Sequence, residues 1–118
     1  MYAYISIHSE DYSKKIKSKV LEQYLTSMFG FATVSHLVFI KKVSGEFIRI
    51  TGISANSNGN YSIYTLEGVE EINLIEIDVP MKLDDTVELA ITDITNAIVK
   101  EFSWIIDEDH GLNDRTNG

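Results

Sequence analysis

Cysteine is absent from this chain, which excludes disulfide bonds, thiolate-bound zinc and a cysteine nucleophile. The longest apolar clusters fall far short of the ~18 residues that a membrane-spanning helix needs. Walker, G-x-G-x-x-G and G-x-S-x-G motifs are also missing, so we expect neither a cofactor nor an enzyme. The N-terminus has no basic start followed by an apolar run, which predicts no signal peptide and a cytoplasmic protein without membrane contact.

The length and composition are those of one folded domain. The chain has 118 residues, of which 44% are hydrophobic, enough to bury a core without a covalent cross-link. Residues 107–118 contain one large apolar residue, Leu112, and cannot offset the entropy of their own ordering. We therefore expect a single domain over residues 1–106 and a disordered acidic tail over 107–118.

Negative charge is concentrated in the second half of the chain. The formal net charge is −8. Residues 1–66 carry seven bases and four acids, a net of +3, whereas residues 67–118 carry fourteen acids and three bases, a net of −11. An acidic protein repels the phosphate backbone, which argues against a nucleic-acid partner. The imbalance indicates an electrostatic role for one face of the molecule.

Hydrophobic periodicity predicts two helices and about five strands. Alternating apolar residues predict strands over 2–7, 34–41, 47–51, 61–66 and 72–79, separated by the turn sequences VSGE, ANSNGN and EGVE. Apolar residues at helical spacing predict one helix over 12–29, capped by Ser9 or Ser13 and ended by Gly30. A second helix starts near Asp84, and its apolar stripe continues to Ile105. The order β-α-β-β-β-β-α predicts an α+β fold, an antiparallel sheet of about five strands with two helices on one face.

The three histidines do not form an obvious site. His8 lies at a strand end beside Ser9, where a polar strand end and a helix cap explain the sequence. His36 lies among apolar strand residues, as expected of a core or half-buried histidine. His110 falls in the expected tail. The segment DEDHGLND (107–114) is rich in oxygen ligands but lacks the spacing of a calcium loop, so we expect no metal site.

Glu76 and Asp78 form the candidate catalytic pair. Both point to the same face of the last predicted strand, about 7 Å apart at ~3.3 Å per residue. Carboxylates at such a separation suit a glycosidase, so a small hydrolase is one alternative function. A structural or oligomerising module is another.

The carboxylates from Glu67 onward also form a candidate partner-binding surface. We expect Ile75, Ile77 and Val79 to face the helices, so that Glu76 and Asp78 project from the open side of the sheet. The other acids lie in the preceding turn and in the first turns of the second helix, so a continuous acidic surface is expected. Its predicted members are Glu67, Glu70, Glu71, Glu76, Asp78, Asp84, Asp85 and Glu88.

In size, acidity, lack of cysteine and predicted α+β make-up, the chain resembles the immunity proteins of bacterial polymorphic toxin systems, above all those of contact-dependent growth inhibition. The resemblance implies a protein that binds a toxin domain, often a basic nuclease, and blocks its active site. Carboxylates suit such a partner because they occupy the lysines and arginines that bind substrate phosphate. We therefore expect a basic protein partner, and the sequence leaves the oligomeric state open.

Overall fold

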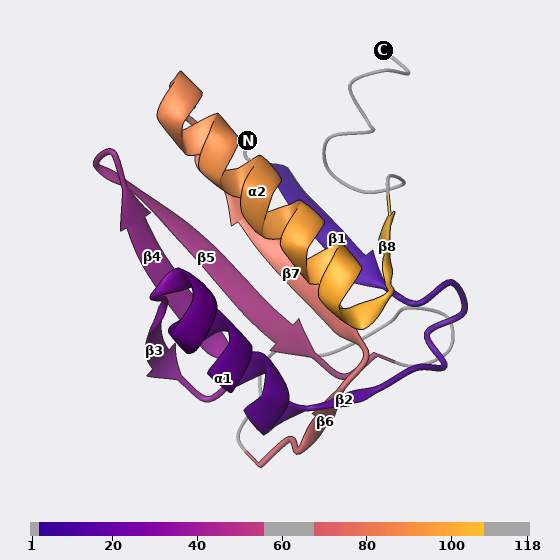
Figure 1. The fold of residues 1–118 in the computed structure, drawn as a ribbon. Coiled ribbons are helices and arrows are strands. Elements are labelled where there is room, and N and C mark those ends of the chain that lie inside the picture. The colour runs from indigo at the N-terminus through magenta and orange to yellow at the C-terminus, as the bar shows by residue number, and fades with distance from the viewer. Residues whose placement is uncertain (1–2, 56–67, 108–118) are drawn as a thin grey trace.

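A computed structural model describes residues 3–55 and 68–107 of the chain (Figure 1). These residues form two helices and eight strands. In chain order they are β1 (Ala3–His8), β2 (Ile16–Lys17), α1 (Ser18–Phe29), β3 (Ala32–Ser35), β4 (Val38–Val43), β5 (Glu46–Ile53), β6 (Glu71–Ile72), β7 (Leu74–Val79), α2 (Asp85–Phe102) and β8 (Ile105–Asp107).

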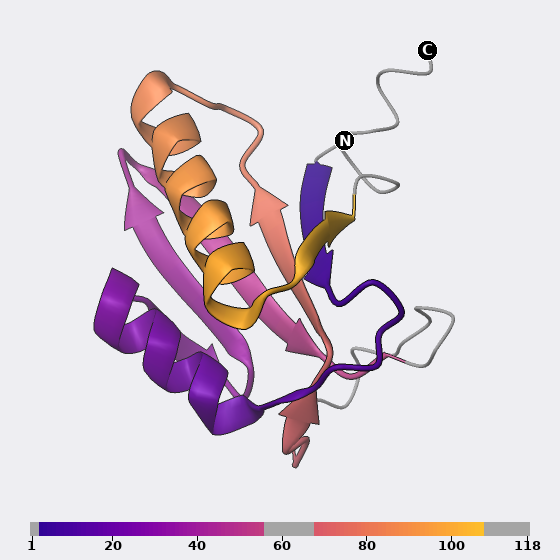
Figure 2. The ribbon, with the colours of Figure 1, turned by 45° about the vertical axis from the view of Figure 1, so that its right-hand side comes forward.

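Six strands form one antiparallel sheet in the order β3-β4-β5-β7-β1-β8. The first strand of the chain thus lies between β7 and β8, whereas β2 pairs only with β6 in a small separate sheet. Both helices lie on the same side of the large sheet (Figure 2). The predicted α+β fold with an antiparallel sheet is therefore confirmed, although β2 and β8 were not predicted. The strand expected over 61–66 lies outside the described residues.

The register of the central strands sorts the side chains into a core face and an open face. Ile5, Ile77 and Ile50 align across β1, β7 and β5, and all three belong to the core or pack against it. The next row, Tyr4, Asp78 and Arg49, points the opposite way because alternate strand residues do. Glu76 and Asp78 therefore project from the side of the sheet away from the helices, as predicted.

Helix α1 begins later than predicted. Residues 12–17 are not helical: Tyr12 has a φ of 62°, and Ile16–Lys17 pair with β6. The helix starts at Ser18, and Gly30 ends it with a φ of 72°, as expected. Val20 and Met28 were predicted on its apolar stripe but are exposed. Only Leu21 and Leu25 are buried on this stripe, so α1 contacts the sheet along a narrow line.

Gly52 allows α1 to approach the sheet closely. A Cβ atom at this position would lie 3.0 Å from Cδ2 of both Leu21 and Leu37 and 3.1 Å from Cδ1 of Ile72. Such distances are shorter than normal carbon contacts, so a side chain would push α1 outward. Ile72 is buried on the core side, although regular alternation over the predicted strand 72–79 would place it on the open face with Glu76, because Asn73 interrupts the alternation between β6 and β7.

The strand predicted over 34–41 is a hairpin. Leu37 has a φ of 65° and a buried side chain, and its carbonyl accepts a hydrogen bond from Gly52 N–H at 2.9 Å. The positive φ of Leu37 turns the chain between β3 and β4. His36, expected to be a core or half-buried histidine, is instead exposed on the turn, where its Nε2 lies 2.6 Å from the carbonyl of Val69.

Helix α2 begins as predicted, with Asp84 as its N-cap, but ends at Phe102 because Ser103 adopts a φ of 56°. Ile105, predicted on the helix stripe, is instead the first residue of β8. Asp107, predicted to open the tail, is the last residue of β8 and pairs with Ser6. Residues 108–118 lie outside the described residues.

Candidate docking surface

The structure divides the predicted acidic surface into three groups. Glu70 precedes β6 and Glu71 is its first residue, Glu76 and Asp78 lie on β7, and Asp84, Asp85 and Glu88 lie at the start of α2. Strand β7 has six residues, about 20 Å at ~3.3 Å per residue, and separates the first group from the last (Figure 1). The expected continuous surface is therefore not formed by these residues. Glu67 lies outside the described residues.

The first group lies among lysines. Lys17 is directly opposite Glu71 in the β2–β6 pair. Both glutamates line a hollow of about 810 Å³ that Lys15, Lys17 and Lys19 also line. Opposite charges at this spacing largely cancel each other's field at a distance. This end of the molecule is therefore mixed in charge and gives Glu70 and Glu71 little attraction for a basic partner.

The second group is half-buried on the open face of the sheet. Glu76 lies between Ser6 and Thr51, and Asp78 lies between Tyr4 and Arg49. Burial raises the pKa of the Asp78 carboxyl, and the charge of Arg49 opposes that rise. Glu76 and Asp78 line neither the hollow beside β6 nor the groove beside α2. Arg49 lies opposite Asp78 in the β5–β7 pair, so its positive charge is close to one member of the candidate catalytic pair.

The third group surrounds exposed apolar side chains. Asp85 and Glu88 are exposed in the first turn of α2, and Leu89, next to them, is 62% exposed. In the loop before the helix, Met81 is 76% and Leu83 44% exposed. We call these five residues, Met81, Leu83, Asp85, Glu88 and Leu89, the α2 surface. Lys82 is the only base from Met81 to Val99, a stretch that holds four acids, so this surface is distinctly negative.

Asp84 has a structural role beside this surface. Its Oδ1 accepts a hydrogen bond from the backbone N–H of Val87 at 2.8 Å, and its Oδ2 accepts one from the Ser44 hydroxyl at 2.8 Å. These two donors hold the pKa of Asp84 below its ordinary value. Because both oxygens are engaged, Asp84 caps the helix and ties it to the β4–β5 turn. It is therefore not a free member of the predicted partner-binding set.

A groove of about 400 Å³ continues from the α2 surface along the helix. One wall is α2, and the other is formed by β1, the end of β7 and β8. Leu83 and Glu88 belong to both the α2 surface and the groove. The remaining lining residues are Ile5, Val79, Ile91, Thr92, Thr95, Asn96 and Ile106. The exposed apolar side chains thus extend into a concave, mostly apolar channel.

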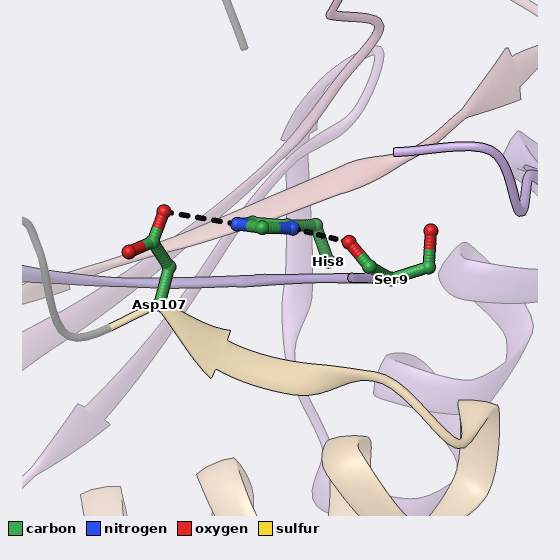
Figure 3. Close-up of polar contacts among 3 residues, drawn as sticks. All are labelled: His8, Ser9 and Asp107. Carbon is green, nitrogen blue, oxygen red and sulfur yellow. Dashed lines mark hydrogen bonds and ion pairs between the residues drawn. The ribbon is translucent and has the colours of Figure 1, made fainter. Parts of the chain in front are cut away.

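His8 forms a buried polar pair that sequence reasoning did not predict. Its Nε2 lies 3.0 Å from Oδ2 of Asp107, and its Nδ1 faces the backbone carbonyl of Ser9 at 2.5 Å (Figure 3). The Tyr12 ring stacks on the imidazole, with centroids 3.9 Å apart. Ser9 Oγ instead accepts a hydrogen bond from the backbone N–H of Lys14 at 3.1 Å. Both imidazole nitrogens therefore face acceptors other than a nucleophile, so this is not a Ser-His-Asp catalytic site. It fastens β8 to β1.

Other classes of site lack support in the described part of the chain. Over residues 3–55 and 68–107, no group of three or more His, Asp or Glu side chains is arranged to hold a metal ion. Neither described helix combines the length and apolar character that crossing a bilayer requires. His110 and most of the calcium-like segment lie outside the described residues.

The sequence contains a signal for the α2 surface in the position of Leu89 on the helix. Val87, Ile91, Ile94 and Ile98 form the buried stripe of α2, and Leu89 lies off this stripe on the polar side. A single exposed leucine is common, but Leu89 follows the exposed Met81 and Leu83 closely in the chain, and grouped exposed apolar residues are typical of interaction surfaces. Its exposure follows from helix geometry once α2 is placed.

A scan of protein-family models, a search of curated proteins and a search of solved structures each found no match to this chain.

Proposed function

We propose that this protein is a non-catalytic binding protein of the immunity type, which neutralises a basic toxin domain by docking it on the α2 surface. The observation that carries the proposal is Leu89, 62% exposed beside Asp85 and Glu88. Interfaces commonly combine a few large apolar anchors with a polar rim. Met81, Leu83 and Leu89 supply anchors, and the carboxylates supply a rim of one sign.

The charge of the surface favours a cationic partner, such as a nuclease domain whose substrate groove is basic. An acidic rim accelerates encounter with such a partner and suppresses acidic ones. In the bound state, carboxylates pair with lysine and arginine side chains that otherwise bind substrate phosphate. The α2 surface suits this role better than the other acidic groups, because Glu71 faces Lys17 and Asp78 faces Arg49.

The test takes the protein encoded by the neighbouring gene, which the proposal expects to contain a basic toxin domain, and measures its affinity for this chain by calorimetry. The double variant Asp85→Lys/Glu88→Lys and the single variant Leu89→Ala are each expected to weaken binding by at least ~10-fold, as for interface hot spots. A matched control, Glu22→Lys/Glu101→Lys, makes the same charge change at exposed positions elsewhere on the two helices. It should weaken binding by less than ~3-fold, because charges outside the interface core act mainly on the association rate.

Equal losses in the two double variants would show that only net charge matters and would overturn the proposed surface. Tight binding with the same affinity for the parent and all three variants would also overturn it. Sedimentation of the chain alone provides the remaining distinction. Self-association that Leu89→Ala abolishes would make the α2 surface a contact between copies and favour the oligomerising module instead.

A further inference from the structure

The groove beside α2 has an apolar floor and an acidic end. Ile5, Ile91 and Ile106 come from β1, α2 and β8 and line its length, while Glu88 and Leu83 lie at the end nearest the start of the helix. From Glu88 to Asn96 the helix rises about 12 Å at 1.5 Å per residue. A channel of this length accommodates the side chains of a short peptide segment rather than a single small group.

A buried polar group in the groove wall lacks a partner. Thr95 lines the groove and is only 4% exposed, yet its hydroxyl makes no hydrogen bond within the described chain. An unsatisfied buried hydroxyl costs about 1–3 kcal/mol, so natural proteins rarely keep one without a use. A valine has nearly the same shape and would avoid this cost. The hydroxyl oxygen is covered in the free chain, so a bound molecule can supply the missing hydrogen bond only if the groove wall moves slightly.

We infer that the groove seats one short segment of the basic partner, in which an apolar side chain packs against Ile5, Ile91 and Ile106 and a neighbouring lysine or arginine pairs with Glu88. The inference rests on the proposed function and specifies which feature of the partner the α2 surface recognises. Two observations favour a protein segment over a free small molecule. Leu83 and Glu88 belong to both groove and α2 surface, and the only acidic lining residue, Glu88, lies where the two meet.

The first experiment uses a small probe with the chemistry of the expected side chains. N-hexylguanidinium is titrated into the full chain, and isoleucine methyl shifts are followed by NMR. Saturable shifts are expected at Ile5, Ile91 and Ile106. Glu88→Gln should weaken binding by about 2- to 5-fold, the size of an exposed ion pair, without changing the affinity for hexanol. No saturable shift at these methyl groups, or equal affinity for hexanoate, would overturn the inference.

The second experiment blocks the groove in the complex with the toxin domain. Thr92→Trp places a large ring in the groove from an exposed position on α2, whereas Ser27→Trp places the same ring on an exposed position of α1 as a control. Groove blocking should weaken the complex by at least ~10-fold and the control by less than ~2-fold. Thr95→Val should stabilise the free chain yet weaken the complex, a combination that simple packing would not produce.

The outcomes separate this inference from the proposed function. If Asp85→Lys/Glu88→Lys weakens the complex but Thr92→Trp does not, the α2 surface stands and the groove inference is overturned. If neither weakens it, the proposed function itself fails. If Thr92→Trp and the charge variant both weaken it while Ser27→Trp does not, both are supported.

Discussion

The two helices begin in opposite ways. α2 starts at an aspartate whose carboxylate accepts a hydrogen bond from Val87 N–H, with Asp85 and Glu88 in the first turn and Lys100 in the last. α1 has Lys17 at its N-cap position, with no side-chain cap hydrogen bond, no acid in its first turn and no base in its last. The charges of α2 therefore complement its helix dipole, whereas Lys17 and Lys19 oppose that of α1.

The start of α1 is held by tertiary hydrogen bonds instead. Ser18 N–H donates to the carbonyl of Glu70 at 2.8 Å, and Ser18 Oγ–H donates to the carbonyl of Val69 at 2.7 Å. α2 is thus stabilised largely by its own sequence, and α1 by the segment around β6. The difference also shows that acidity alone is a poor guide to a docking site, because Asp84 serves the helix while its neighbour Asp85 is available to a partner.

The largest expected effect comes from releasing the far end of α2. Asp107→Ala removes one member of the buried His8–Asp107 pair, which fastens β8 to β1. Because β8 follows α2 in the chain, this pair also holds the end of the helix. Leaving the buried His8 nitrogen without its hydrogen-bond acceptor costs up to about 3 kcal/mol. The measurement is urea unfolding followed by the fluorescence of Trp104, the only tryptophan, which is buried where α2 leads into β8. A loss below about 1 kcal/mol would mean that the pair does not hold this end of α2.

Gly52→Ala tests the contact on which α1 depends. The added methyl group meets Leu21 and Leu37 at 3.0 Å, so the helix or its leucines must move. Overpacking of this kind costs about 1–3 kcal/mol. Hydrogen exchange should show faster opening of α1 than of α2. Equal acceleration of exchange in both helices would indicate that they unfold as one unit, and would contradict the view that the two helices are held by different contacts.

Ser18→Ala removes the side-chain anchor of α1 while keeping its backbone bond to Glu70. Because the hydroxyl is buried and its bond is short, the free energy of unfolding should fall by about 1 kcal/mol. Ser27→Ala, on the exposed side of the same helix, is the control and should change stability little. If Ser18→Ala matches that control, α1 does not depend on the contact with Val69.

Asp84→Ala removes the cap of α2, and its effect should depend on pH. The pKa of Asp84 is lowered in the folded state, so its contribution to stability is present above about 3.9, the ordinary value, and is lost as the pH falls through the lowered value. The variant should therefore be less stable than the parent at pH 7, with the difference shrinking in acid. Thermal unfolding between pH 2.5 and 7 checks this.

Asp78→Asn provides the control of opposite sign. Burial raises the pKa of Asp78, so its contribution to stability is present at low pH and is lost as the pH rises through the raised value. The asparagine variant should be more stable than the parent at pH 7 and should lose this advantage in acid. A parallel response of the two variants to pH would contradict the assignment of a cap to one carboxylate and a burial cost to the other.

The sequence predicted best where the signals were local. The start of α2 followed from Asp84 and the apolar stripe, and the end of α1 followed from Gly30. The start of α1 was mispredicted because Ser18 is held by Val69 and Glu70, which are far away in the chain. β8 was missed for the same reason: Ile105 fits a helix stripe by spacing and becomes a strand residue only through its pairing with His8.

The α2 surface shares two residues with the acidic surface predicted from the sequence. Asp85 and Glu88 were among the expected partner-binding residues, and β7 presents Glu76 and Asp78 on the expected face. Their separation was not predictable without the topology, since β7 carries the chain from Glu71 at one end of the sheet to Asp85 at the other. Charge counts along a sequence contain no information on that direction.

The smallest expected effect tests the charge pattern of the two helices directly. Lys19→Glu replaces an opposing charge in the first turn of α1 by a favourable one and should raise the free energy of unfolding by about 0.3–1 kcal/mol. Lys100→Glu makes the same charge change in the last turn of α2, where it should lower stability by a similar amount. Because both variants change the net charge equally, general repulsion cancels in the comparison. The difference should shrink at ~1 M salt, where screening acts over about 3 Å, and a difference that persists there would mean that contacts other than the helix dipole set it.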